Sequence, residues 1–321
     1  MNGWVRAAVA ALAMLAISDM AGAQSFPSKP VRLLVPYPAG GAVDVLARTL
    51  GEVVSKTWGQ PVVVENRPGA GGVIASQALA TSPPDGHTLI VVASGHATNP
   101  FLYPSLPYDT FKDFTSISLL ASSPNLLLVR ADSPFKTVAD VIAAAKAKPG
   151  DLSFAHAGNG TSTHFAGELL KSLAKVDIVA VPYKGGAPAI NDLIGGQIPL
   201  SFNNGPESVG QIAGGTVRAL AVTTGKRAAF LPDVPSMSET VPGYDTEVWW
   251  GVLGPVGMSP DLVAKISRDF VEALNNPTVK ERLTKLGASS IGSSPKEFDA
   301  KIRADYDKWG PIIKAAGIKS E

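Results

Sequence analysis

The stretch Val31–Gly41 (VRLLVPYPAGG) gives the clearest indication of the fold. Residues 31–37 form a continuous apolar run, which is typical of a strand buried on both faces of a sheet. Gly40 and Gly41 end that run, and a helical pattern follows from Ala42 to about Lys56. A buried strand that passes through a glycine turn into a helix is the first half of a parallel α/β unit.

The same alternation continues through the first two-thirds of the chain. Further strands are predicted at residues 62–65, 88–93, 126–129, 151–155, 179–183, 199–202 and 217–222, and further helices at 137–148, 162–175, 187–194 and 208–212. Thr137 and Asp140 form a predicted capping box. A proline-rich connection, a strand at 248–253 and three helices beginning at Pro260, Pro277 and Pro295 complete the chain. This pattern predicts an α/β fold with mainly parallel sheets flanked by helices.

Composition excludes several classes of site. The chain has 321 residues, a formal net charge of +1 and no cysteine, which rules out disulfides, thiolate zinc sites and Fe–S clusters. No Lys/Arg-rich run is present, so a nucleic-acid partner is not expected. The histidines lack zinc-site spacing, and no nucleotide-binding or nucleophile-elbow motif is present. We therefore expect neither a metal nor a cofactor.

Residues 1–23 have the features of a secretory signal peptide. Arg6 precedes an apolar run over residues 7–17, and Ala21-Gly22-Ala23 gives a small-x-small cleavage pattern. The run is shorter than the roughly 20 residues that a membrane-spanning helix needs. A retained membrane anchor is the competing interpretation. A cleaved signal predicts export to the periplasm.

The loops between strands and helices are the candidate binding sites, because ligands of open α/β sheets bind beyond the carboxyl ends of the strands. The first loop contains Tyr37, Pro38, Ala39, Gly40 and Gly41. Its small residues leave backbone N–H groups accessible at a helix start, which favours an anion such as a carboxylate. A tight turn that requires glycine is the alternative. For Asp44, in the first helical turn, we favour stabilisation of the helix start over ligand contact.

A second loop offers more polar groups than one helix cap needs, and we interpret it as a second anion-binding loop. His164 is a candidate donor to a carboxylate, with a helix-surface histidine of no ligand role as the alternative. The candidates in this loop are Gly158, Asn159, Gly160, Thr161, Ser162 and His164.

Two more loops follow predicted strands, and ordinary turns explain them equally well. One contains Ser94, Ala97, Thr98 and Asn99, and the other begins at Asn203. The adjacent Trp249 and Trp250 face opposite sides of a predicted strand, so we expect one in the core and consider the other a candidate for the cleft.

Taken together, these motifs resemble the substrate-binding proteins of tripartite tricarboxylate transporters, the Bug or TctC family. The resemblance runs from Phe26 to Ile318. The segments that carry it are FPSKPVRLLVPYPAGGAVDVLAR (26–48), VVVENRPGAGG (62–72), PDGHTLIV (84–91), VPYKGGAPAINDLIGGQI (181–198), VRALAVTTGKRAAFLPDVPSMSE (217–239) and KAAGIK (314–319).

The resemblance implies a two-lobed fold of the type II periplasmic-binding class, with the ligand held between lobes that close on it. We place the first lobe at residues 24–125 plus 223–321 and the second at 126–222. The family's ligand loops correspond to residues 37–41, 94–99 and 158–164, and to Asn203. The implied partners are a small organic acid and the membrane subunits of a transporter, or alternatively a sensor protein. We expect a monomer.

Asn203 carries a specific hypothesis, because many members of the family have Asp at that position. Loss of that charge would remove a partner for a ligand ammonium group. The hypothesis is therefore that this protein prefers a carboxylate without an amino group. An exported α/β hydrolase is the rival from another class, with Ser162 or Thr161 and His164 as its only local nucleophile–base candidates.

Overall fold

The computed structural model describes residues 26–319, so the predicted signal peptide lies outside the described residues. Five strands and the two-residue strand β10 form the sheet of what we call the first lobe. β1 (Val31–Val35) pairs in parallel with β2 (Val62–Asn66) and β3 (Thr88–Ala93). β9 (Glu247–Pro255) then runs antiparallel to both β3 and the first part of β4 (Phe114–Arg130).

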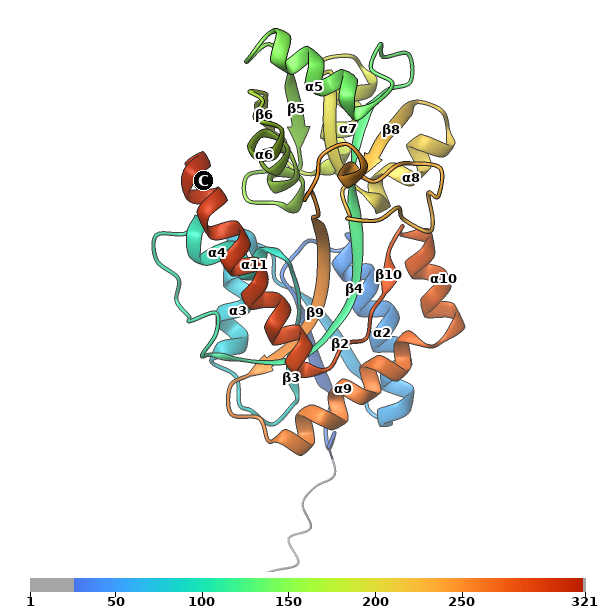
Figure 1. Ribbon diagram of the computed structural model, residues 1–321. Helices are drawn as coiled ribbons and strands as arrows, with labels where there is room; N and C mark the ends of the chain where they lie inside the picture. Colours follow the sequence, from blue (N-terminus) through green and yellow to red (C-terminus); the bar gives the residue numbers. More distant parts are fainter. Residues whose placement is uncertain (1–25, 320–321) are drawn as a thin grey trace, which may run out of the picture.

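Helices cover this sheet on both faces (Figure 1). The apolar side of α2 meets the buried side chains of β1 and β3 in one core cluster, and Trp249 of β9 lies in a second cluster on the other face. The first-lobe helices are α2 (Ala42–Trp58), α3 (Val73–Ala80), α4 (Gly95–Leu102), α9 (Pro260–Leu274) and α10 (Pro277–Lys285). The two-residue strand β10 (Ser289–Ser290) pairs with β4.

The second lobe is built on the last part of β4. β7 (Leu200–Asn204) and β8 (Val217–Val222) pair antiparallel with it, and β5 (Ser153–His156) joins β7 to β6 (Val179–Pro182) by parallel pairing. Both core clusters of this lobe consist mainly of apolar side chains from these strands and their helices. The helices are α5 (Val138–Ala147), α6 (Ser162–Ala174), α7 (Gly186–Ile194) and α8 (Gly205–Ala213).

β4 changes sheets between Pro124, which pairs with β9, and Asn125, which pairs with β7. The returning chain crosses beside it. The backbone N–H of Asn125 donates to Thr223 Oγ1 over 2.8 Å, and the hydroxyl of Thr223 donates to the carbonyl of Thr246 over 2.7 Å. Hydrogen bonds therefore join the crossing segments where the lobes meet.

α11 (Pro295–Ala316) is a further connection and runs along both lobes (Figure 1). Phe298 and Ile302 in its first half pack in a first-lobe cluster. Trp309 and Ile313 in its second half pack with the second-lobe core, where Trp309 stacks on Phe165 with ring centroids 5.1 Å apart. The C-terminal helix therefore stabilises the position of one lobe against the other.

The predicted α/β class is confirmed, as is the capping box of Thr137 and Asp140. Two details differ. The sheets are mixed rather than mainly parallel, because β4 and β9 run antiparallel to their neighbours. Residues 95–99, expected in a loop, form the start of α4, and His96 to Asn99 are buried there. No helix within residues 26–319 is long and apolar enough to cross a membrane.

Candidate functional site

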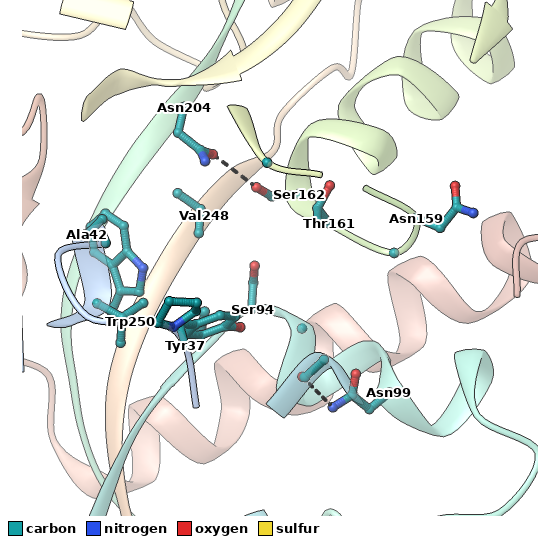
Figure 2. Close-up of a pocket in the computed structure, with 18 of the residues that line it drawn as sticks. Tyr37, Ala42, Ser94, Asn99, Asn159, Thr161, Ser162, Asn204, Val248 and Trp250 are labelled. Atoms are coloured by element: carbon teal, nitrogen blue, oxygen red, sulfur yellow. Dashed lines mark hydrogen bonds between the residues drawn. The ribbon is translucent and has the colours of Figure 1, made fainter. Parts of the chain in front are cut away.

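A cavity of about 360 Å³ lies between the two lobes, close to where β4 and β9 pass from one to the other (Figure 2). Its first-lobe wall consists of Tyr37, Pro38, Gly41, Ala42, Val43, Gly71, Ala93, Ser94, Gly95, Asn99, Leu102, Tyr103, Val248 and Trp250. Its second-lobe wall consists of Asn159, Gly160, Thr161, Ser162, Gly185, Asn204 and Glu207.

Five helices begin at this cavity. The residue that precedes the first turn of each of α2, α4, α6, α7 and α8 lines it. Only in α6 does the side chain of that residue cap the helix, where Thr161 Oγ1 accepts from the N–H of His164. The first N–H groups of a helix have no intrahelical partner and mark its positive end. Since no Lys or Arg is among the described residues of the wall, the helix starts supply its positive potential.

The loop before α2 is held by Asp44. Its carboxylate accepts the N–H of Gly40 over 2.9 Å and the Nε of Arg48 over 3.0 Å, and also the Nδ2 of Asn66 over 2.9 Å. Burial of this carboxyl opposes its ionisation, but these hydrogen bonds and the charge of Arg48 outweigh burial and lower the pKa of Asp44. Asp44 does not line the cavity, so it stabilises the loop at the start of α2 rather than contacting a ligand, as predicted.

The loop before α6 is held by His164. Its Nδ1 accepts the N–H of Gly160 over 3.2 Å, and its ring stacks on His156 with centroids 4.1 Å apart. Burial, with smaller contributions from His156 and Lys171, lowers the pKa of His164 to about 3. The ring is therefore neutral at pH 7. His164 is only 5% exposed and lies outside the wall, so the expected alternative of a helix-surface histidine is wrong.

Gly160 itself lies against the opposite lobe. Its φ of +75° is in the left-handed region, and a Cβ at this position would lie 2.4 Å from Cδ1 of Leu102. Leu102 belongs to the C-terminal end of α4. Glycine is therefore needed here both for the loop conformation and for the close approach of the two lobes.

Ser162 connects three elements at the second-lobe wall. Its hydroxyl lies 3.2 Å from Oδ1 of Asn125 and 3.4 Å from Oδ1 of Asn204, the second of which is drawn in Figure 2. The start of α6 is thereby linked to β4 and to the residue that precedes α8. This places a hydroxyl and an amide side by side on the second-lobe wall, to which Asn159, Thr161 and Glu207 also contribute polar side chains.

Aromatic and apolar side chains dominate the first-lobe wall. Burial, helped by Tyr103 and Tyr108, raises the pKa of Tyr37 to about 12, so its hydroxyl stays protonated and able to donate. Trp250 lines the cavity, whereas Trp249 is fully buried and its Nε1 donates to Asp305. The prediction that the two tryptophans face opposite sides, one of them toward the cleft, is confirmed.

The structure brings together nine of the predicted site residues. These are Tyr37, Pro38, Gly41, Ser94, Asn99, Asn159, Gly160, Thr161 and Ser162. Those that lie outside the wall are Ala39, Gly40, Ala97, Thr98, Gly158, His164 and Asn203. Ala97 and Thr98 are turned into the protein by α4, and Asn203 is fully buried, with its Nδ2 donating to the carbonyl of Gly186 over 3.0 Å.

Most of the missed residues lie in strands, in helices or at helix ends, although Gly71 and Gly185 come from segments that follow β2 and β6. Val248 lies within a strand, and Leu102 and Tyr103 lie at the end of a helix. Asn204, next to the predicted Asn203, reaches the cavity instead. Glu207 also lines it, from the first turn of α8. Among these residues, only Asn204 has a sequence signal, which is the Asn-Gly turn.

Comparisons with known proteins agree with this architecture. The model of the tripartite tricarboxylate transporter family receptor matches residues 46–318. A UPF0065 protein of Pseudomonas sp. is 38% identical, with 94% of this chain and 91% of the relative covered. An R. palustris protein solved with adipate is 37% identical with a TM-score of 0.82, and the match covers 92% of this chain and 99% of that one.

The periplasmic binding protein BugD is 34% identical with a TM-score of 0.79, and the match covers 92% of this chain and 100% of BugD. The predicted periplasmic-binding fold is thereby confirmed. The chain belongs to the tripartite tricarboxylate transporter receptor family of solute-binding proteins, as the sequence motifs predicted.

Proposed function

We propose that this protein is a periplasmic solute-binding protein that captures a small organic carboxylate between its lobes and delivers it to the membrane subunits of a tripartite tricarboxylate-type transporter. One observation carries the proposal: five helices begin at a single cavity whose described wall has no Lys or Arg. Helix starts stabilise a carboxylate through N–H groups and the helix dipole, without a salt bridge. A relative solved with adipate supports this ligand class.

The position of the cavity supports capture by closure. Its walls belong to different lobes, and the two crossing segments are joined by the hydrogen bonds of Thr223. A ligand that contacts both walls stabilises the arrangement in which the walls are close. The cavity is therefore suited to convert ligand binding into a lobe arrangement that a membrane partner can recognise.

The contacts of Ser162 and His164 argue for binding rather than catalysis. A nucleophilic serine needs its hydroxyl hydrogen-bonded to a base. Here the hydroxyl of Ser162 faces the amide oxygens of Asn125 and Asn204, while Nδ1 of His164 accepts the N–H of Gly160. The pKa of His164, lowered to about 3, also makes it a weak base. We therefore propose stoichiometric binding without turnover.

Thermal unfolding against a panel of carboxylates tests this function. A ligand that binds only the folded protein at 100-fold above its Kd adds about 2.7 kcal/mol of stability, which a melting curve detects. We expect a shift with at least one carboxylate, one ligand bound per chain and no product formed on prolonged incubation. No shift across mono-, di- and tricarboxylates, or conversion of a bound acid, would contradict the proposal.

A further inference from the structure

Glu207 is the one acidic residue among the described residues of the cavity wall. We propose that Glu207 determines ligand specificity. Its carboxylate selects carboxylates whose far end carries a hydrogen-bond donor, such as an ammonium or hydroxyl group, and disfavours a second carboxylate at the second-lobe wall. This inference rests on the proposed function, because it concerns the far end of a ligand held in that cavity.

The carboxylate of Glu207 has no cationic partner within the described part of the chain. None of the ion pairs there includes it, and its hydrogen-bonding neighbour is Nδ2 of Asn204, which donates to Oε2 over 3.2 Å. Desolvation of the carboxyl by neighbouring atoms raises the pKa of Glu207, although the residue is exposed at the cavity, and the hydrogen bonds of Asn204 only partly offset that effect. A ligand donor that replaces water at this carboxylate would gain a charge-assisted hydrogen bond.

The carboxylate of Glu207 also lies close to Gly186, the first residue of α7. A Cβ at Gly186 would lie 2.4 Å from Oε2 of Glu207 and 2.3 Å from Oδ1 of Asn203. Glu207 therefore lies close to the start of α7, the positive end of that helix. A second ligand carboxylate at this helix start would meet the like charge of Glu207.

This placement also bears on Asn203. The preference for an amine-free ligand assumed that an uncharged residue at position 203 leaves the site without an acidic group. Glu207 supplies such a group from the following helix, adjacent to the amide of Asn203 and on the cavity side. The charge that selects the far end of the ligand is therefore carried by α8 rather than by β7.

Calorimetry with length-matched ligands at pH 7.5 tests the proposal. The panel pairs succinate, glutarate and adipate with the ω-amino and ω-hydroxy acids of the same length. We expect the wild-type protein to bind the best donor-ended acid about tenfold or more tighter than its dicarboxylate partner. Glu207→Gln, which keeps the shape but removes the charge, should reduce that ratio about tenfold. Glu207→Ala should reduce it too, and Glu272→Gln on α9 is the control that leaves it unchanged.

The outcomes distinguish failure of the role of Glu207 from failure of carboxylate capture. The role of Glu207 is overturned if the wild-type protein prefers the dicarboxylate, or if both Glu207 variants keep the wild-type preference. Either result leaves carboxylate capture intact. If neither wild-type nor variant protein binds any acid of the panel or any other carboxylate, carboxylate capture fails and the role of Glu207 fails with it. Equal melting temperatures of the free proteins show that the substitutions leave the fold unchanged.

Discussion

The loop before α2 and the loop before α6 are built alike but differ in charge. In each, a glycine N–H donates to the side chain four residues later: Gly40 to Asp44, and Gly160 to His164. Asp44 is an ionised carboxylate supported by Arg48, whereas His164 is a neutral ring stacked on His156.

This difference separates the roles of the two loops. A carboxylate beside the start of α2 offsets part of the positive potential of that helix end, whereas a neutral ring leaves the start of α6 unopposed. The second-lobe loop also carries the hydroxyls of Thr161 and Ser162. We therefore infer that the loop before α6 is the stronger anion-binding element, and that the loop before α2 mainly shapes the cavity.

Lowering the pH should have the largest effect on stability, because it protonates the two buried histidines beside the loop before α6. The pKa is lowered to about 4 for His156 and about 3 for His164, below the ordinary value of about 6.5 that the unfolded chain has. Because the unfolded chain binds more protons below pH 6.5, the free energy of unfolding falls as pH drops toward the folded values. Each histidine should cost about 2 kcal/mol at pH 5.

Urea unfolding of wild-type and His164→Gln proteins at pH 7 and pH 5 measures this effect. Glutamine keeps an acceptor for the N–H of Gly160 but does not titrate, so the variant should lose less stability between the two pH values. Asp44→Asn is the matched control in the other loop. The lowered pKa of Asp44 places its titration well below pH 5. Replacing this carboxyl should therefore leave unchanged the difference in the free energy of unfolding between pH 7 and pH 5. Identical pH dependence in wild-type and His164→Gln would contradict the assignment.

Ser162→Ala should have the next largest effect, on ligand affinity. The substitution removes a donor at the start of α6, and a hydrogen bond to a charged group is worth about 1.5–3 kcal/mol. We expect the Kd for the bound carboxylate to rise about tenfold or more, measured by calorimetry. Ser172→Ala, at an exposed position of the same helix, should bind like the wild type. Unchanged binding by Ser162→Ala would remove the loop before α6 from the anion contact.

Asp44→Asn, in the loop before α2, should have the smallest effect on ligand affinity. Its side-chain oxygen still accepts the N–H of Gly40, while the charge that opposes the start of α2 is lost. We expect the Kd to change less than about threefold, and the free energy of unfolding to fall by about 1 kcal/mol because the contact with Arg48 weakens. A loss of affinity as large as that of Ser162→Ala would place the main anion contact at α2 instead.

The sequence predicts the first and second ligand loops well because both are continuous segments that follow buried strands. Tyr37, Gly41 and Ser162 need only the rule that binding loops follow the carboxyl ends of strands. The glycine and proline of α4 weaken its helical signal, so the sequence predicts a loop where Ala97 and Thr98 lie on the buried face of a helix.

Residues that depend on long-range pairing could not be found in this way. Val248 reaches the cavity beside the predicted Trp250 because β9 lies between β3 and β4, an arrangement set by antiparallel pairing across the chain. Asn203 and Asn204 alternate across a strand end, so a register difference of one residue decides which of them faces the cavity.

We propose that helix starts bind a carboxylate between the lobes, with no basic side chain among the described residues of the wall. Calorimetric comparison of a bound acid with its primary amide tests this mode of binding, since the two have nearly the same shape and differ in charge. Charge-assisted hydrogen bonds are roughly twice as strong as neutral ones, so the amide should bind at least about tenfold more weakly. Equal affinity for the acid and the amide would contradict the account.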